Sequence, residues 1–146
     1  MKKAKILIVI PARRGSKGIK SKNKKLLLGK PLVSYSLEAA SMLPKNYTSI
    51  ISTDDSEIID IANNYNISNN GLRPKNLSGD SALTLDVLNY ELAKTEDSLN
   101  AKFDGVMLLQ PTCPIRDLNH IQDIEEIFTR NGGLSSVVSV KKIDSE

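Results

Sequence analysis

A basic loop that contains two glycines is the first feature of the sequence whose residue types could do chemistry. It is Pro-Ala-Arg-Arg-Gly-Ser-Lys-Gly, residues 11–18, and Lys22 and Asn23 follow closely. Glycines let a backbone approach a ligand, and the exposed N–H groups of such a turn form an anion-binding concavity. The charges of Arg13 and Lys17 make this combination suitable for a triphosphate. A solvated basic loop is the alternative interpretation.

The spacing within this loop argues against two common nucleotide-binding motifs. It lacks the Gly-Lys-Ser/Thr ending of a Walker A motif and the Gly-x-Gly-x-x-Gly pattern of dinucleotide-binding folds. Residues 1–30 nevertheless contain no acidic residue, and all 17 Asp and Glu lie in the rest of the chain, so the basic segment favours an anionic ligand. A nucleic-acid ligand is disfavoured, because Tyr35 is the only aromatic residue among the first 40 and stacking surfaces are scarce.

The composition is that of a soluble globular domain. The chain has 146 residues, of which 40% are hydrophobic and 25% charged, which argues against intrinsic disorder. No apolar run reaches the roughly 18 residues that a membrane helix needs. The single cysteine, Cys113, cannot form an internal disulfide, so we expect a reducing, cytoplasmic setting.

Strands and helices are expected to alternate along the chain. Residues 5–10 form a continuous β-branched run, which is typical of a strand buried on both faces of a parallel sheet. Strands are expected over residues 5–10, 48–53, 105–109 and 135–140, and helices after Pro31, after Asp54 or Asp55, after Thr84 as a cap, and after Asp117 or Asn119. The order predicts an α/β fold with a mainly parallel sheet. Ligands bind such sheets at the carboxyl ends of the strands, here near residues 11–18, 53–54 and 110–111.

Four segments in order resemble the acylneuraminate cytidylyltransferases, also called CMP-sialic acid synthetases. They are residues 10–19 with Lys22-Asn23, Ser52-Thr53-Asp54, Arg73-Pro74 leading into residues 77–82, and Leu-Leu-Gln-Pro-Thr-Cys-Pro-Ile-Arg at 108–116. The resemblance spans essentially the whole chain. It implies a Rossmann-like three-layer αβα fold of the nucleotide-diphospho-sugar transferase type, with residues 1–146 as a single nucleotide-binding domain.

The resemblance also implies a reaction. This family transfers a cytidylyl group from CTP to a nine-carbon α-keto sugar acid and releases pyrophosphate. N-acetylneuraminate, legionaminate and pseudaminate are the candidate acceptors. A related octulosonate cytidylyltransferase ranks low, because its loop usually lacks the Gly-Ser-Lys-Gly arrangement of residues 15–18. The family implies Mg²⁺ as cofactor, but Gln110 stands where related enzymes place a metal-binding Asp, and no complete metal site can be assembled from these residues.

The resemblance assigns roles to particular residues. Arg13, Lys22 and Gln110 are the expected catalytic residues, with Gln110 also facing the sugar acid. The expected nucleotide-binding residues are Arg13, Gly15, Ser16, Lys17, Gly18, Lys22, Asn23, Arg73, Asp80, Ala82 and Thr84.

Each of the main positions also has a structural interpretation. Arg13 could form a surface ion pair, and Asn23 could be a turn residue. Arg73 could hold an extended loop. Asp80 could form a turn or cap a helix. Gln110 could satisfy loop backbone groups at the end of a strand.

The family continues well past the position of Glu146. The expected missing part holds the dimerisation segment, most contacts to the sugar acid and the aspartates that bind Mg²⁺. We therefore expect a chain truncated at its C-terminal end. A non-catalytic CTP-binding module or an inactive fragment is the alternative to an active transferase, and the homodimer typical of the family stays open for this chain.

Overall fold

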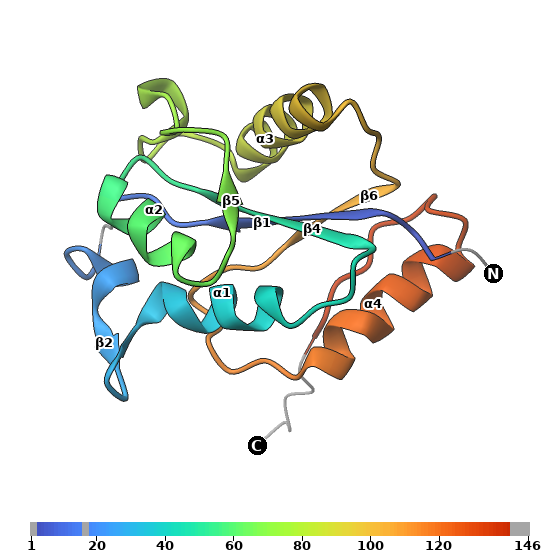
Figure 1. Cartoon of the computed structure of the whole chain (residues 1–146), viewed down its shortest axis with the longest axis horizontal. Helices are drawn as coiled ribbons and strands as arrows, with labels where there is room; N and C mark the ends of the chain where they lie inside the picture. The colour runs from blue at the N-terminus through green and yellow to red at the C-terminus, as the bar shows by residue number, and fades with distance from the viewer. Residues whose placement is uncertain (1–2, 16–17, 141–146) are drawn as a thin grey trace, which may run out of the picture.

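A parallel sheet runs through the middle of the computed structural model, which describes residues 3–15 and 18–140 (Figure 1). Within these residues the sheet has the strand order β5-β4-β1-β6. The strands are β1 (Ile6–Pro11), β4 (Tyr47–Ser52), β5 (Ser68–Asn69) and β6 (Gly105–Leu108). Every neighbouring pair is parallel, which confirms the predicted sheet. Pro11 lies opposite Ser52 in the register, so β1 and β4 end side by side.

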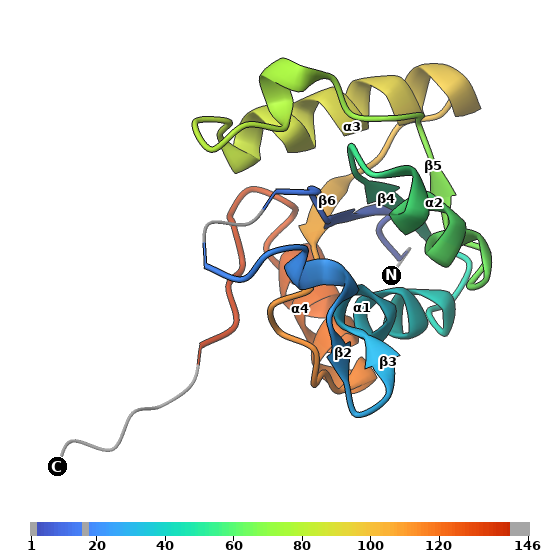
Figure 2. The same ribbon diagram turned by 90° about the vertical axis from the view of Figure 1, so that its left-hand side faces the viewer.

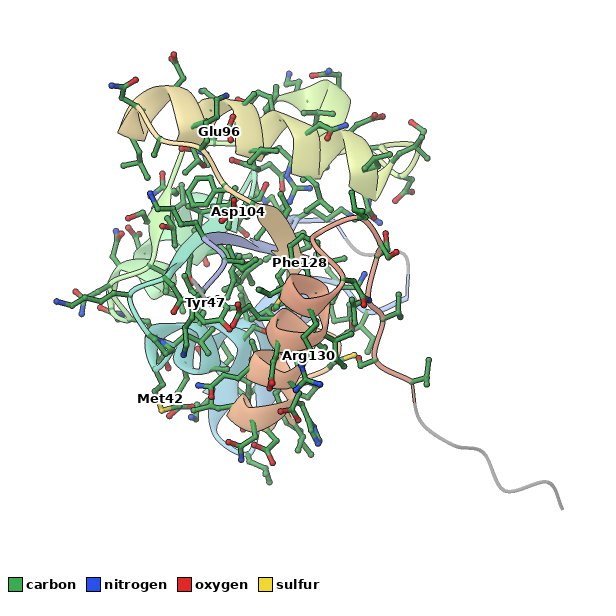
Figure 3. All side chains as sticks on the ribbon, turned by 90° about the vertical axis from the view of Figure 1, so that its right-hand side faces the viewer. Met42, Tyr47, Glu96, Asp104, Phe128 and Arg130 are labelled. Carbon is green, nitrogen blue, oxygen red and sulfur yellow. The ribbon has the colours of Figure 1, made fainter. Side chains whose placement is uncertain are left out.

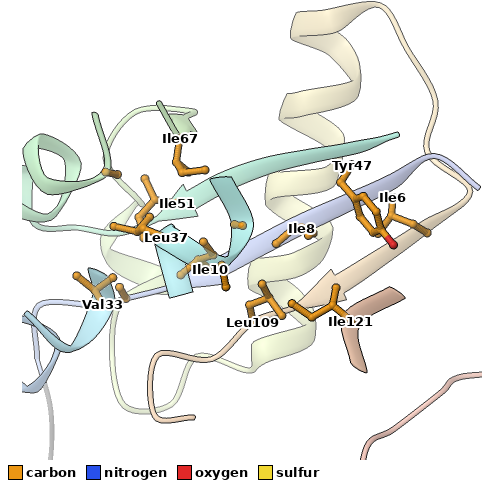
Figure 4. Packing of buried hydrophobic residues seen from close by; sticks show 14 of the residues in the cluster. Ile6, Ile8, Ile10, Val33, Leu37, Tyr47, Ile51, Ile67, Leu109 and Ile121 are labelled. Carbon is orange, nitrogen blue, oxygen red and sulfur yellow. The ribbon is translucent and has the colours of Figure 1, made fainter. Parts of the chain in front are cut away.

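The central strand β1 is buried on both faces because its side chains are apolar at every position. Successive side chains of a strand point to opposite faces. Ile8 and Ile10 accordingly join the larger core cluster, whereas Leu7 and Val9 join a second, smaller cluster on the other face. All four are 0% exposed. Figure 4 shows the larger cluster, in which Ile8 and Ile10 lie near the labelled side chains of neighbouring elements.

Helices cover both faces of the sheet, so the molecule has three layers (Figures 1 and 2). Helix α1 (Leu32–Ser41), α2 (Ser56–Asn63) and α4 (Leu118–Arg130) contribute side chains to the larger core cluster. Helix α3 (Thr84–Leu99) packs on the opposite face. Figure 3 shows the two outer layers from the side, with Glu96 on α3 and Arg130 on α4. The expected αβα arrangement is confirmed.

Short elements surround the basic loop. They are the 3₁₀ turns η1 (Lys22–Lys24) and η2 (Lys75–Leu77), and the hairpin of β2 (Leu26–Leu27) and β3 (Lys30–Pro31). Within the described residues, no helix has both the length and the apolar character needed to cross a membrane.

Several local predictions need correction. Thr84 does not cap α3: Leu83 occupies the N-cap position, no side chain makes a cap hydrogen bond, and Thr84 is the first helical residue. The strand expected over residues 135–140 is absent, because β6 pairs only with β1 among the described residues and this segment has no strand beside it. Val138 and Val140 are 75% and 89% exposed.

Two helix starts had alternative candidates, and the structure selects one at each. Asp55, not Asp54, caps α2 by accepting a hydrogen bond from the Glu57 N–H at 3.1 Å. Asp117, not Asn119, caps α4, since its carboxylate accepts from the Asn119 N–H at 2.8 Å.

Asp55 is buried and also forms an ion pair with Lys24 at 2.8 Å. Burial opposes its charge, but the hydrogen bonds from Lys24 and the Glu57 N–H outweigh burial, and the pKa of Asp55 lies below the ordinary value of 3.8. The ionised form is therefore favoured by folding, and its stabilising contribution is complete above that ordinary value. It is lost as the pH falls through the lower pKa of the folded state.

We predict that Asp55→Ala lowers the free energy of unfolding by about 1 to 2 kcal/mol at pH 7, because the helix loses its N-cap. Urea unfolding measures the difference. The difference in the free energy of unfolding should narrow as the pH falls below 3.8, because the unfolded chain then binds a proton that the native carboxylate does not, until the pH passes the lower pKa of the folded state. Asp60→Ala, at an exposed position of the same helix, is the matched control and should leave the midpoint nearly unchanged. Equal midpoints for both variants would contradict the assignment.

Candidate functional site

A cleft of about 410 Å³ opens where β1, β4 and β6 end. The predicted site residues that the structure describes all line it. They are Arg13, Gly15, Gly18, Lys22, Asn23, Arg73, Asp80, Ala82, Thr84 and Gln110. The other two predicted residues, Ser16 and Lys17, lie outside the described residues. Residues from three separate segments, 11–23, 73–87 and 110–112, thus face one cavity at the carboxyl edge of the sheet, where ligands bind in parallel α/β folds.

The first wall of the cleft is the loop after β1, and the end of β4 holds its beginning in place. The Ala12 N–H donates to the Ser52 carbonyl oxygen at 2.9 Å. The Thr53 hydroxyl donates to the Ala12 carbonyl oxygen at 2.6 Å and accepts from the Asp55 N–H at 3.1 Å. Both Ala12 and Thr53 are 0% exposed, so these hydrogen bonds satisfy buried groups that would otherwise be costly.

Two further hydrogen bonds hold the next part of the loop. The Arg14 N–H donates to Asp54 Oδ1 at 2.7 Å. Asn23 Nδ2 donates to the Arg13 carbonyl oxygen at 3.1 Å, and Asn23 is buried. Asn23 and Asp54 thus fix the backbone course that carries Arg13 and Gly15. Asn23 does lie in a turn, η1, but its side chain binds the backbone of Arg13 rather than that of its own turn. Its contact with a nucleotide stays a prediction.

An ion pair joins the two sides of the cleft. Arg13 Nη1 lies 2.5 Å from Asp80 Oδ1, although 67 positions separate the two residues. Their side chains are 30% and 54% exposed, and ion pairs with this much solvent contribute little to stability. The structural interpretation of Arg13 as an ion-pair residue is thus confirmed, whereas its partner Asp80 had been expected to form a turn or cap a helix. An anion that enters the cleft competes with Asp80 for the Arg13 guanidinium.

The second wall contains Arg73, which is 7% exposed. Its Nε donates to Ser52 Oγ at 3.0 Å, its Nη2 donates to the Ser52 carbonyl oxygen at 2.5 Å, and its Nη1 donates to the Leu77 carbonyl oxygen at 3.3 Å. Burial lowers the pKa of Arg73 below its ordinary value, and the nearby carboxylates of Glu91 and Asp54 oppose that effect. Arg73 thus holds its loop, as the structural interpretation expected, and also lines the cleft.

Gln110 follows β6 and is exposed at the cleft. Its backbone carbonyl accepts from the Cys113 N–H at 3.1 Å and from Arg116 Nη2. Its side-chain amide makes no hydrogen bond within the described part of the chain, so the structural role expected for that amide is not found. The cysteine at 113 is exposed and unpaired.

Sequence reasoning missed several residues around this site. Leu77, Val87 and Thr112 line the cleft without having been singled out. Glu91 lies behind Arg73 and is 1% exposed. A signal for Glu91 was present, since a carboxylate falls on the same helical stripe as Val87, at a spacing of four residues.

The described residues contain no group of three or more His, Cys, Asp and Glu that could hold a metal ion. Mg²⁺ takes near-octahedral oxygen coordination, usually with one or two carboxylates plus phosphate oxygens and water. The described residues therefore do not form a Mg²⁺ centre of their own.

Thr53→Val tests how the loop after β1 is held. The substitution keeps the side-chain shape but leaves the Ala12 carbonyl and the Asp55 N–H without the hydroxyl, so we expect a loss of about 1 to 3 kcal/mol in the free energy of unfolding. Thr48→Val is the matched control, because Thr48 lies half-buried on β4, the strand that ends just before Thr53, and makes no side-chain hydrogen bond among the described residues. Thermal unfolding measures both. A similar loss in both variants would show that the Thr53 hydroxyl has no special part in holding the loop.

The sequence and the fold were compared with known proteins. A family model described as "Cytidylyltransferase" matches residues 7–144. The chain is 39% identical over 139 residues to a CMP-N,N'-diacetyllegionaminic acid synthase of Legionella pneumophila, covering 95% of this chain and 59% of that protein. It is 34% identical over 140 residues to an N-acylneuraminate cytidylyltransferase of Escherichia coli, covering 96% of this chain and 32% of that protein. The chain thus spans only part of the length of these relatives.

Among solved structures, a CMP:2-keto-3-deoxy-manno-octonic acid synthetase in complex with CTP has a TM-score of 0.69 and 21% identity, covering 90% of this chain and 50% of that one. This likeness supports the fold. The family model covers nearly the whole chain, and the chain belongs to the cytidylyltransferase family.

Proposed function

We propose that the cleft binds CTP, and that this chain supplies the nucleotide-binding part of an enzyme that transfers a cytidylyl group to a sialic-type nonulosonic acid. The observation that carries the proposal is the meeting of three separate sequence segments, residues 11–23, 73–87 and 110–112, in one cleft at the carboxyl edge of the sheet. Membership of the cytidylyltransferase family supports CTP as the nucleotide. The legionaminic and acylneuraminic names of two relatives support a nine-carbon acceptor.

The triphosphate is assigned to the wall formed by the loop after β1. Arg13 and Lys22 line this wall and supply positive charge, while Gly15 and Gly18 leave the backbone open to close approach. A Cβ added at either glycine would meet nothing within 4 Å, so the space beside the loop is open. The guanidinium group of Arg13 and the ammonium group of Lys22 are suited to neutralising the charge of phosphate oxygens.

The cytidine is assigned to the opposite wall. Arg73 offers the guanidinium N–H groups that its three protein hydrogen bonds leave over, and Asp80, Ala82 and Thr84 line the same side. Gln110 stands where the two walls meet the end of β6, and its side chain makes no hydrogen bond to the described protein. We assign its amide to the sugar acid and the adjoining phosphate.

The proposed reaction forms one bond and breaks another. The oxygen of the anomeric hydroxyl attacks the α-phosphorus of CTP, and the bond from that phosphorus to the bridging oxygen of the β-phosphate breaks. The hydroxyl proton passes to solvent water, and pyrophosphate leaves with the bond's electron pair. Fixed cations that face the phosphate oxygens stabilise the charge that accumulates there, and a fixed cleft holds the reacting groups in line.

Mg²⁺ belongs to the proposal only as a companion of the triphosphate. The described residues do not form a metal centre, and no step of the reaction is assigned to a metal held by them. The second candidate function is a module that binds CTP without turning it over.

Three further expectations stay proposals. The choice among N-acetylneuraminate, legionaminate and pseudaminate is open, because sugar-choosing residues are expected outside this sequence. A homodimer follows only from the family resemblance. A cytoplasmic location is consistent with the single, free cysteine.

We predict selective CTP binding in a calorimetric titration with Mg²⁺ present, with ATP, GTP and UTP as comparison ligands. Lys22→Ala should weaken CTP binding by about tenfold, since a charge-assisted phosphate contact contributes on the order of 1 to 2 kcal/mol. Lys45→Ala removes an exposed lysine outside the cleft and should leave the affinity for CTP unchanged.

Equal binding of all four nucleotides, or none, would overturn the cytidine assignment. Where CTP binds, addition of each nonulosonic acid and measurement of pyrophosphate separate the two candidate functions. Pyrophosphate release supports the transferase, and binding without release supports the non-catalytic module.

A further inference from the structure

A buried carboxylate lies directly behind the cytidine wall of the cleft. Glu91, on α3, is 1% exposed. Its Oε1 accepts from the Ser52 hydroxyl at 2.5 Å and its Oε2 accepts from Asn70 Nδ2 at 2.7 Å. Neither a lysine nor an arginine forms an ion pair with it among the described residues. A carboxylate buried in this way needs a nearby positive charge or strong donors.

The Ser52 hydroxyl lies between Glu91 and a positive charge, the Arg73 guanidinium. Arg73 Nε donates to the same Ser52 oxygen at 3.0 Å, and Arg73 and Glu91 attract each other electrostatically. The three groups therefore form a continuous line from the helix to the cleft: Glu91, Ser52, Arg73. Ser52 and Arg73 are themselves 0% and 7% exposed, so little water screens this line.

The chemistry of the groups fixes the direction of every hydrogen bond in this line. A serine hydroxyl has one proton to donate, and an ionised carboxylate can only accept. The Ser52 proton therefore points to Glu91, and a lone pair of the hydroxyl oxygen is left for Arg73 Nε. The Ser52 carbonyl oxygen accepts from Arg73 Nη2 at 2.5 Å. Two fixed acceptors on one residue set the plane of the guanidinium.

We propose that Glu91 is a positioning residue that acts through the Ser52 hydroxyl to set the orientation of the Arg73 guanidinium, and so of the Arg73 N–H groups that face the bound nucleotide. The identity of that ligand as CTP rests on the proposed function, whereas the effect of Glu91 on Arg73 does not. A role confined to packing α3 against the loop after β5, through Asn70 and Thr95, is the competing explanation.

Glu91→Gln separates these explanations. The glutamine has one acceptor oxygen in place of two, so it cannot accept from both the Ser52 hydroxyl and Asn70 Nδ2. With its NH₂ group toward Ser52, it donates to the Ser52 oxygen and competes with Arg73 Nε for that acceptor. Ser52→Ala removes the middle group directly. Thr95→Val is the matched control, because Thr95 lies on the same helix, is 2% exposed and contacts Asn70 but not Ser52.

The first readout needs no ligand. In ¹⁵N-labelled protein the Nε–H signal of Arg73, identified by its loss in Arg73→Lys, reports the hydrogen bond to Ser52. We expect exchange of this proton with water to become at least about tenfold faster in Glu91→Gln and Ser52→Ala, in line with the loss of a coupled hydrogen bond. Thr95→Val should lower the unfolding temperature without changing this exchange.

The second readout is the Kd for CTP. Glu91→Gln should raise it about tenfold, and adding Glu91→Gln to Arg73→Lys should raise it no further, because the positioned group is already gone. Unchanged Nε–H exchange in Glu91→Gln, an equal change in Thr95→Val, or full additivity with Arg73→Lys would overturn the proposal. If the unaltered chain binds no CTP, the proposed function fails, and the exchange rates still decide the role of Glu91.

Discussion

Ser52 is the residue on which both walls of the cleft depend. It ends β4 beside the end of β1, and its carbonyl oxygen accepts from the Ala12 N–H on one side and from Arg73 Nη2 on the other. Its hydroxyl joins Arg73 to Glu91. Because the parallel register sets Pro11 opposite Ser52, the loop after β1 begins within reach of both. The cleft is thus a consequence of the strand register.

The charges of the cleft are arranged around the same point. Arg13 is paired with Asp80 at the solvent side, whereas Arg73 faces Glu91 only through a hydroxyl. The exposed pair can be exchanged for another anion at little loss, because water already screens it. The buried charges of Arg73 and Glu91 cannot be separated at little loss, because either charge left alone in the interior would carry a large desolvation penalty. The wall with Arg13 is therefore adaptable and the wall with Arg73 is rigid.

Much of the fold could be predicted from the sequence, because β1 and the longer helices carry strong periodic patterns. The short strands β2, β3 and β5 have two residues each, which is too few to show any period, and they exist only because a neighbour pairs with them. The converse holds for residues 135–140, which have a strand-like composition without a neighbouring strand. Thr84 looked like a helix cap from its type, but the backbone turns into α3 one residue earlier, at Leu83.

The candidate site shows the same division between what a residue's type reveals and what only its neighbours reveal. Arg13 and Lys22 could be singled out because they add positive charge in and just after a glycine-containing loop, whereas Gln110 was singled out by the family resemblance. The loop-holding parts of Asn23 and Asp54 could not, since each depends on a backbone group that the fold brings near.

The division of the cleft into two walls also bears on how such a site would act on a triphosphate. A cation that contacts the phosphates equally before and during the reaction increases affinity alone, whereas one that faces the departing pyrophosphate gains as negative charge moves onto it. The adaptable wall, with Arg13 and Lys22, stands on the side assigned to the phosphates, where that charge develops. The rigid wall stands on the side assigned to the cytidine, the part of the nucleotide whose charge does not change. A guanidinium that can release Asp80 is thus placed where the charge changes, and one locked by Ser52 and Glu91 is placed where only position matters.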